Sequence, residues 1–321
     1  METQHNGRSS FSGKLGFVLS AAGASVGLGN IWRFPYLAAK YGGGIFLLIY
    51  ILLAVTFGYT MIMAETALGR MTRKSPVGAF AAFGKGRWRA FGGWINAVIP
   101  ILIVPYYSVI GGWVIKYLVG YITGHGSELA QDGYFSSFIA NGASVEIVFL
   151  LFTLLTLGII FAGVRNGVER VSRMMMPVLV LFAAVTSSIA LTESAVSTFE
   201  DELGWSRKKA AAVIGIIMVL LGSLSALGYG PLSGVTVIGM QFLDFFDFLT
   251  NSVMMPIAAI AICLLVTSVI GVEKIEEEVT QKGQPFRRKK VFNFMIRTLC
   301  PVFAAIILVS SVANALGWIS M

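Results

Sequence analysis

Charged side chains are scarce in this 321-residue chain, in which 56% of residues are hydrophobic and only 12% are charged. Soluble domains carry about twice that share of charge, so the composition excludes an ordinary soluble protein. Histidine and cysteine are equally scarce, with two of each, which argues against a disulfide framework. We also find no His/Cys/carboxylate cluster at metal-ligand spacing, no phosphate-binding loop and no nucleophile elbow. We therefore expect neither an enzyme nor an organic cofactor.

Apolar runs of about 20 residues, the length that crosses a bilayer as a helix, recur along the chain. They predict an all-α polytopic membrane protein with about eight spans, in a single transmembrane domain covering residues 1–321. The expected spans lie near residues 14–38, 44–69, 91–122, 145–164, 174–199, 210–228, 250–271 and 294–318. Cys263 and Cys300 fall in two of these runs, so we expect buried thiols. The first dozen residues are polar and of mixed charge, which argues against a cleavable signal peptide.

The formal net charge of +8 comes from basic residues in short loops, as the positive-inside rule expects. It therefore indicates a bilayer and not a nucleic acid as the partner. The loops at residues 70–89 and 165–173 are basic and should be cytoplasmic. The loop at residues 123–141 has no Lys or Arg and should be outside. We expect a multi-pass protein of the cytoplasmic (cell inner) membrane.

The orientation rule fails at residues 174–199, which are long enough for one span but not for two. Basic loops precede this run and also follow it, at Arg207, Lys208 and Lys209, so both ends should lie inside. Two arrangements would resolve this conflict. Either residues 174–199 form a re-entrant hairpin, or the last three spans insert against their charges.

The first span is interrupted by Gly23, Gly27, Gly29 and Pro35. Glycine costs about 1 kcal/mol and proline about 3 kcal/mol inside a helix, so the spacing predicts a broken helix. Broken helices at membrane depth line cavities and supply ion and substrate sites. The alternative is a kinked helix whose glycines allow close packing against a neighbour.

The stretch G-A-S-V-G-L-G-N-I-W-R-F-P at residues 23–35 resembles the first span of the neurotransmitter:sodium symporter family, in its bacterial amino-acid-transporter branch. The resemblance implies an inverted-repeat sodium symporter fold and sodium-coupled amino-acid uptake by alternating access. Residues 1–177 resemble the family's first to early fifth spans, and residues 182–321 resemble its middle eighth to eleventh spans. The spans between them are missing, so the fold should be incomplete. This loss of an odd number of crossings accounts for the orientation conflict.

The resemblance implies sodium ions as coupling ions, held by neutral oxygens. One site would use the backbone carbonyls of Gly23, Val26 and Ala183 and the hydroxyls of Thr186 and Ser187. A second site would use Ser25 and Asn30, but its other ligands lie in the missing spans. The alternative for the Thr186–Ser188 hydroxyls is bonding to their own helix, as is common in membrane helices.

The resemblance also implies an amino-acid pocket lined by Ala24, Leu28, Gly29, Ile103, Tyr107, Ser188 and Leu191. Monoamine carriers of the family have an acidic residue at the position of Gly27, whereas amino-acid carriers keep a small one. The alternative for Tyr107 is a packed aromatic pair with Tyr106. The opposite wall of the pocket should be missing.

Two charge pairs resemble the family's gates, Arg33 with Asp247 and Arg8 with Asp201. The alternative for the second pair is two solvated loop charges, because exposed ion pairs contribute only about 0–1 kcal/mol. Glu65 and Glu193 lie in apolar runs, where a carboxylate is a candidate functional group. In the family, the position of Glu65 supports the sixth span, so its partner should be absent here.

Together these features predict sodium-coupled symport of an amino acid, impaired in this shortened chain. The expected partners are the amino acid, sodium and the bilayer, and an oligomer is left open. The alternative is a non-transporting membrane remnant or an assembly partner of a full-length transporter.

Overall fold

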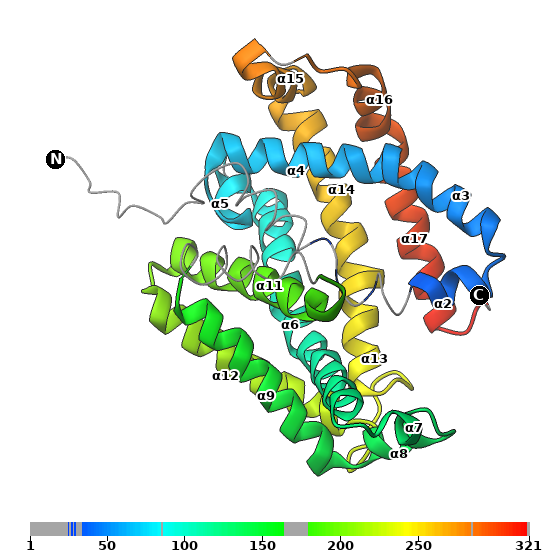
Figure 1. Ribbon diagram of the computed structural model, residues 1–321. Helices are drawn as coiled ribbons and strands as arrows, with labels where there is room; N and C mark the ends of the chain where they lie inside the picture. The colour runs from blue at the N-terminus through cyan, green and yellow to red at the C-terminus, as the bar shows by residue number, and fades with distance from the viewer. Residues whose placement is uncertain are drawn as a thin grey trace. The chain divides into compact units, whose positions relative to one another are not determined.

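The chain is helical throughout the part that a computed structural model describes, namely residues 25, 27, 29, 34–84, 86–163, 179–283 and 285–319 (Figure 1). Within those residues, β-structure is limited to one isolated bridge between Val237 and Met240. The expected all-α class is therefore confirmed for this part of the chain.

Most helices follow one another with short connections, whereas residues 228–241 form a longer one. In chain order they are α2 (Phe34–Lys40), α3 (Gly44–Leu53), η2 (Ala54–Gly58), α4 (Tyr59–Thr72), α5 (Pro76–Ala81), α6 (Arg87–Ile122), α7 (Gly126–Leu129), α8 (Tyr134–Ala140), α9 (Gly142–Phe161), α11 (Leu179–Leu203), α12 (Arg207–Leu227), α13 (Phe242–Asp247), η5 (Phe248–Met254), α14 (Met255–Leu265), η6 (Val266–Ile270), α15 (Val272–Thr280), η7 (Gln281–Gly283), α16 (Lys289–Phe294), η8 (Met295–Leu299) and α17 (Cys300–Ala315). The segments η2, η5, η6 and η8 are π-helical and continue the helices beside them.

Six helices in the described part are long and apolar enough to cross a membrane. They are Gly44–Thr72, Arg87–Ile122, Gly142–Phe161, Arg207–Leu227, Phe242–Ile270 and Lys289–Ala315. Each coincides with one of the eight spans expected from the sequence. The first expected span lies mostly outside the described residues, and the expected span at 174–199 corresponds to α11, which is not among the six.

Helix α11 contradicts the re-entrant hairpin that we considered for residues 174–199. It runs without a turn through 25 residues, from Leu179 to Leu203. A helix of that length is about 37 Å long, so its two ends cannot lie side by side. The hairpin prediction is therefore wrong for the described residues, because one helix without glycine or proline continues through them. Reversed insertion of the last three spans stays a prediction.

The chain forms two compact units, which are described separately. Unit 1 comprises Met1–Pro35, Pro100–Ser197 and Trp205–Phe246, and unit 2 comprises Tyr36–Ile99, Thr198–Gly204 and Asp247–Met321.

In unit 1, glycines bring helices together by receiving large aromatic side chains. Helices α9 and α12 lie side by side (Figure 1), and Gly222 of α12 receives the ring of Phe149 from α9. Gly111 of α6 receives the ring of Phe152 in the same way. A Cβ on Gly111 would lie 2.5 Å from this ring, so the ring fits because glycine has no side chain. Since lipid tails are as apolar as these side chains, such close packing is what associates helices in a membrane.

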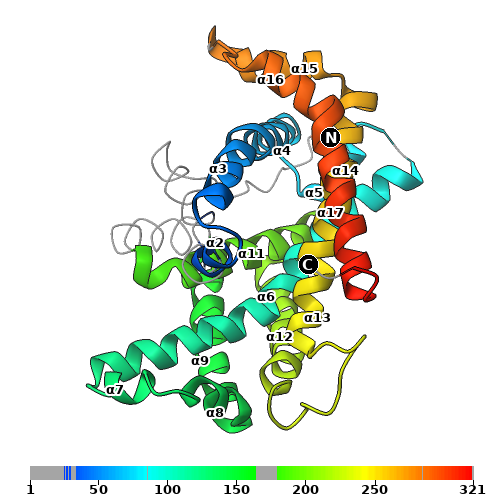
Figure 2. The ribbon, with the colours of Figure 1, turned by 90° about the vertical axis from the view of Figure 1, so that its right-hand side faces the viewer.

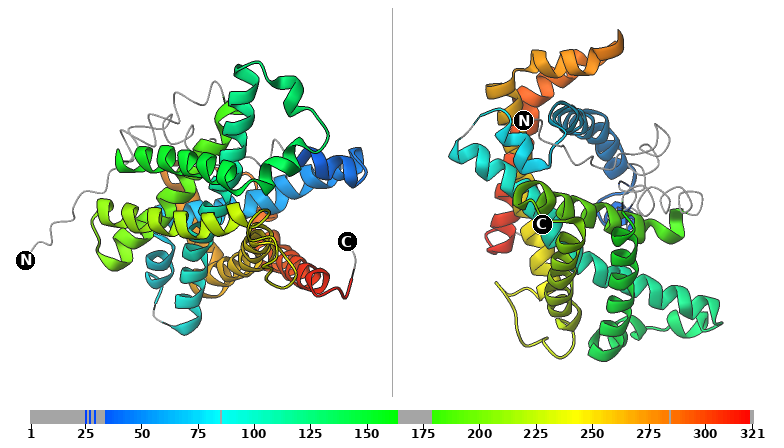
Figure 3. Two further views of the ribbon diagram at one scale, coloured as in Figure 1. Left: turned by 90° about the horizontal axis from the view of Figure 1, so that it is seen from below. Right: turned by 90° about the vertical axis from the view of Figure 1, so that its left-hand side faces the viewer.

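In unit 2, α14 and α17 run side by side (Figure 2), and α4 packs against the α14–η6 segment. Their contact buries Ala64, Leu265 and Ile296 completely. Cys263 and Cys300 are free thiols in this core, so their expected burial is confirmed. Helices α15 and α16, orange at the top of the right-hand view of Figure 3, form a hairpin at one end of the unit.

The backbone contact at Gly112 generates a stability prediction. A Cβ on Gly112 would lie 2.7 Å from the backbone nitrogen of Phe149 and 2.8 Å from the carbonyl carbon of Val148. Backbone atoms cannot rotate away, so Gly112→Ala should cost about 1–3 kcal/mol and lower the unfolding temperature by several degrees. The matched control is Gly158→Ala in α9, where no heavy atom of the described chain lies within 4 Å of the added methyl group. Thermal unfolding in detergent should show no loss for Gly158→Ala; equal losses for both variants would contradict this account.

Candidate functional site

Gly27 is the point where the first span meets two other helices of unit 1. It is not helical, although Ser25 is α-helical and Gly29 is π-helical. A Cβ at Gly27 would lie 2.6 Å from Tyr107 Oη of α6 and 2.9 Å from Ser187 Oγ of α11. Contacts this short do not occur at real Cβ atoms, so a larger residue here would have to displace the Tyr107 or Ser187 hydroxyl. The junction brings together two hydroxyls that the sequence analysis assigned to the site.

The second feature of the site is a row of buried hydroxyls on α11. Thr186, Ser187 and Ser188 expose 3%, 6% and 0% of their surface, so none of them is an ordinary solvated side chain. Because α11 is helical from residue 179, residues 183, 186 and 187 share one face, as expected. Ser188 is engaged by α9, since Thr156 Oγ1 donates to Ser188 Oγ at 3.4 Å. Sequence analysis missed Thr156, because a lone threonine in an apolar run carries no signal.

The other expected pocket residues are only partly described. Ile103 is buried and Tyr107 half-buried, one turn apart on α6, while Leu191 on α11 is half-buried. Ser25 and Gly29 are exposed. The remaining residues expected in the sodium sites, the pocket and the gates lie outside the described residues; they are Arg8, Gly23, Ala24, Val26, Leu28, Asn30 and Arg33.

The two acidic residues that we expected in gates have local contacts. Asp247 Oδ1 accepts a hydrogen bond of 2.7 Å from Asn251 Nδ2, one turn later. Asp201 Oδ2 accepts from the backbone nitrogen of Ser75 at 2.6 Å, and Ser75 Oγ donates to Glu202 at 3.2 Å. Ser75 is the N-cap of α5, where the helix dipole favours negative charge. Asp201 therefore holds the start of α5, a role that its sequence position did not indicate.

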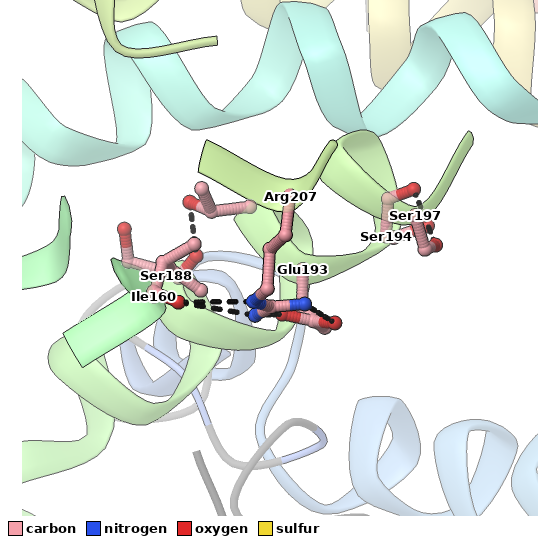
Figure 4. Close-up of polar contacts among 7 residues, drawn as sticks. Ile160, Ser188, Glu193, Ser194, Ser197 and Arg207 are labelled. Atoms are coloured by element: carbon pink, nitrogen blue, oxygen red, sulfur yellow. Dashed lines mark hydrogen bonds and ion pairs between the residues drawn. The ribbon is translucent and has the colours of Figure 1, made fainter. Parts of the chain in front are cut away.

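Glu193 has a clear partner, which sequence analysis did not assign. Arg207, the first residue of α12, donates to both carboxylate oxygens of Glu193, at 2.9 and 2.5 Å. Its Nε and Nη2 atoms also donate to the carbonyl oxygen of Ile160, at 3.3 and 3.1 Å (Figure 4). Both charged side chains are about four-fifths buried. This cluster ties the last turn of α9 and the first turn of α12 to the middle of α11.

Glu65 differs from Glu193. It is exposed on α4, and no side chain or backbone group of the described chain forms a hydrogen bond or ion pair with it. Ile62, Thr66 and Gly69 on the same face are exposed as well. The span that contains them, Gly44–Thr72, is the least buried of the six described spans.

Comparison with known proteins identifies the family. The model of the sodium:neurotransmitter symporter family matches residues 8–130 and 147–317. The chain belongs to this family. It is accordingly a multi-pass membrane protein of a transporter family and not an enzyme.

Among the relatives of this chain, an uncharacterized sodium-dependent transporter of Bacillus subtilis, YhdH, is 38% identical over 174 residues, covering 53% of this chain and 39% of the relative. An uncharacterized sodium-dependent transporter of Haemophilus influenzae is 33% identical over 197 residues, covering 57% of this chain and 43% of the relative. The matched region is thus about two fifths of each relative. The crystal structure of MhsT in complex with L-phenylalanine superposes with a TM-score of 0.83 at 23% identity, covering 95% of this chain and 100% of that one. MhsT therefore shares the fold.

The Arg207–Glu193 cluster generates a prediction about coupling. Glu193→Gln and Arg207→Gln should each lower the unfolding temperature. The double variant should lose less stability than the two single variants added together, which gives a coupling free energy of about 1–3 kcal/mol between the two side chains. The more exposed pair of Lys289 and Glu276, 2.6 Å apart, serves as the control. Its coupling should stay below about 1 kcal/mol because water screens it. Equal coupling in both thermal-unfolding cycles would contradict a special role for the buried cluster.

Proposed function

We propose that this family member serves sodium-coupled symport of an amino acid across the cytoplasmic membrane, by alternating access. We further propose that the shortened chain keeps one sodium site but transports poorly. The observation that carries the proposal is the junction at Gly27, where the backbone of an interrupted first helix meets the hydroxyls of Tyr107 and Ser187.

The residues around this junction suit a sodium ion. A desolvated cation needs several oxygens, and neutral carbonyls and hydroxyls are less costly in a membrane than carboxylates. Thr186 and Ser187 provide buried hydroxyls on one face of α11, the face that also includes residue 183. We infer that these residues, with the carbonyls of Gly23 and Val26, form the retained sodium site. Ser25 and Asn30 would belong to the second, incomplete site.

The junction also favours an amino acid over an amine as substrate. A side chain at Gly27 would have to displace the hydroxyl of Tyr107 or Ser187, which disfavours a protein carboxylate there. A substrate that brings its own carboxylate can use the Tyr107 hydroxyl and the backbone amides near Leu28 and Gly29. MhsT, which has this fold, was crystallised with L-phenylalanine.

We infer reduced transport from the family spans that, by the resemblance, have no counterpart in this chain. Ser25 and Gly29, which we assign to the sodium and substrate sites, are exposed. A pocket open on one side cannot exclude water or hold a substrate during a conformational change. The charge pairs Arg33 with Asp247 and Arg8 with Asp201 would then not act as complete gates.

Sodium binding and transport can be tested separately. Sodium chloride, compared with potassium chloride, should raise the unfolding temperature, because a ligand of the folded state stabilises it. Ser187→Ala should weaken the apparent sodium affinity at least tenfold. Ser197→Ala is the control, since the Ser197 hydroxyl donates to its own helix at the Ser194 carbonyl, 3.0 Å away.

An unchanged sodium effect in Ser187→Ala would contradict the site. In proteoliposomes, sodium-driven amino-acid uptake should be near background. Uptake at the rate of a full-length relative would contradict the proposal that the missing spans matter.

The state of Glu65 favours a second candidate, an assembly partner of a full-length transporter. An exposed carboxylate within an apolar helix is costly in lipid and is stabilised by a donor on a neighbouring helix. In co-purification from membranes, Glu65→Gln should weaken such a complex several-fold. Glu277→Gln, in the exposed part of α15, should leave it unchanged. Absence of any complex would exclude this role.

A further inference from the structure

Four consecutive basic residues, Arg287 to Lys290, lie where the helix Lys289–Ala315 begins. All four are exposed. The positive-inside rule explains why basic residues occur in this loop, but not why they remain exposed and in part unpaired.

Most of the acidic side chains near this run form ion pairs with basic residues outside it. On α15, Glu278 binds Arg70 at 2.9 Å, and Glu273 lies 3.5 Å from Arg297. Glu276 binds Lys289 at 2.6 Å. Lys289 is thus the one residue of the run with an acidic partner in the part of the chain that the structure describes.

The other three cations are differently placed. Arg287 and Lys290 form no ion pair with any described residue. The guanidinium of Arg288 lies over the ring of Tyr59, 5.2 Å from its centroid. Stacking on an aromatic face holds the guanidinium plane while its N–H groups remain available for an anion.

Apolar side chains adjoin these cations on the same helix. Val291 and Phe294 expose 39% and 58% of their surface, and Phe294 lies one turn after Lys290, on the same face. The surface therefore presents positive charge and then exposed apolar groups, the order in which a phospholipid presents its phosphate and its acyl chains.

We propose that Arg287, Arg288 and Lys290 bind the phosphate of an anionic phospholipid, with Val291 and Phe294 contacting its acyl chains. Guanidinium groups match phosphate oxygens in a bidentate manner, and runs of basic residues beside the end of a span attract anionic lipids. Two basic residues at the start of α12 are engaged instead: Lys209 lies 4.1 Å from the Trp205 ring centroid, and Arg207 binds Glu193. The proposal is independent of sodium or amino-acid binding.

The test is native mass spectrometry of the full chain released from detergent with phosphatidylglycerol or phosphatidylcholine. Each basic residue near a membrane surface contributes about fivefold to anionic-lipid binding, so Arg287→Gln/Lys290→Gln should lose at least tenfold in phosphatidylglycerol affinity. The control Lys208→Gln/Lys209→Gln removes the same charge from another exposed site and should lose less than threefold. Arg288→Lys, which keeps the charge but loses the planar fork, should lose several-fold.

Three results would overturn the proposal. Equal losses in the two double variants would mean general attraction to basic loops. Equal retention of phosphatidylcholine and phosphatidylglycerol would mean that charge is not recognised. Displacement of the lipid by millimolar inorganic phosphate would mean a free-phosphate site. Unfolding temperatures of all variants, measured in the same detergent, verify that each is folded.

Discussion

The close approach of backbone to side chain at Gly27 is the constraint on which the candidate site depends. Tyr107 Oη and Ser187 Oγ lie 2.6 and 2.9 Å from the position where any larger residue would place its Cβ. Three separate parts of the chain can meet there because one of them has no side chain. This removes one possible protein carboxylate from the site and leaves backbone and hydroxyl groups to do the binding.

Elsewhere the chain keeps polar groups inside an apolar protein by pairing them. Arg207 donates hydrogen bonds to the Glu193 carboxylate and to a carbonyl at the end of α9. Asp201 accepts from the backbone N–H at the start of α5. Ser223 of α12 donates to Glu146 of α9. Each pairing joins residues that are far apart in sequence. Since an unpaired charge is costly where water is absent, these contacts also define which helices are neighbours. Glu65 has no such partner in the described part of the chain, and it lies exposed on α4.

Much of the fold could be predicted because membrane spans are local signals. A run of about 20 apolar residues can be recognised in the sequence alone, and six expected spans correspond to described helices. Both cysteines lie in such runs and are buried as expected. The re-entrant hairpin was wrong for the opposite reason. It was inferred from loop charges, which report the sides of a membrane and not the course of the helix between them, and α11 runs straight through residues 179–203.

The sequence by itself determined the class, the family and the row of hydroxyls on α11, because apolar length, a long motif and helical spacing are all local in the chain. The tertiary structure alone decided that Arg207 pairs with Glu193, that Thr156 reaches Ser188, and that Asp201 holds the start of α5. These contacts depend on how helices approach one another. No pattern in a single sequence records the distance between two helices, because that distance is set by the packing of side chains such as Phe149 against Gly222.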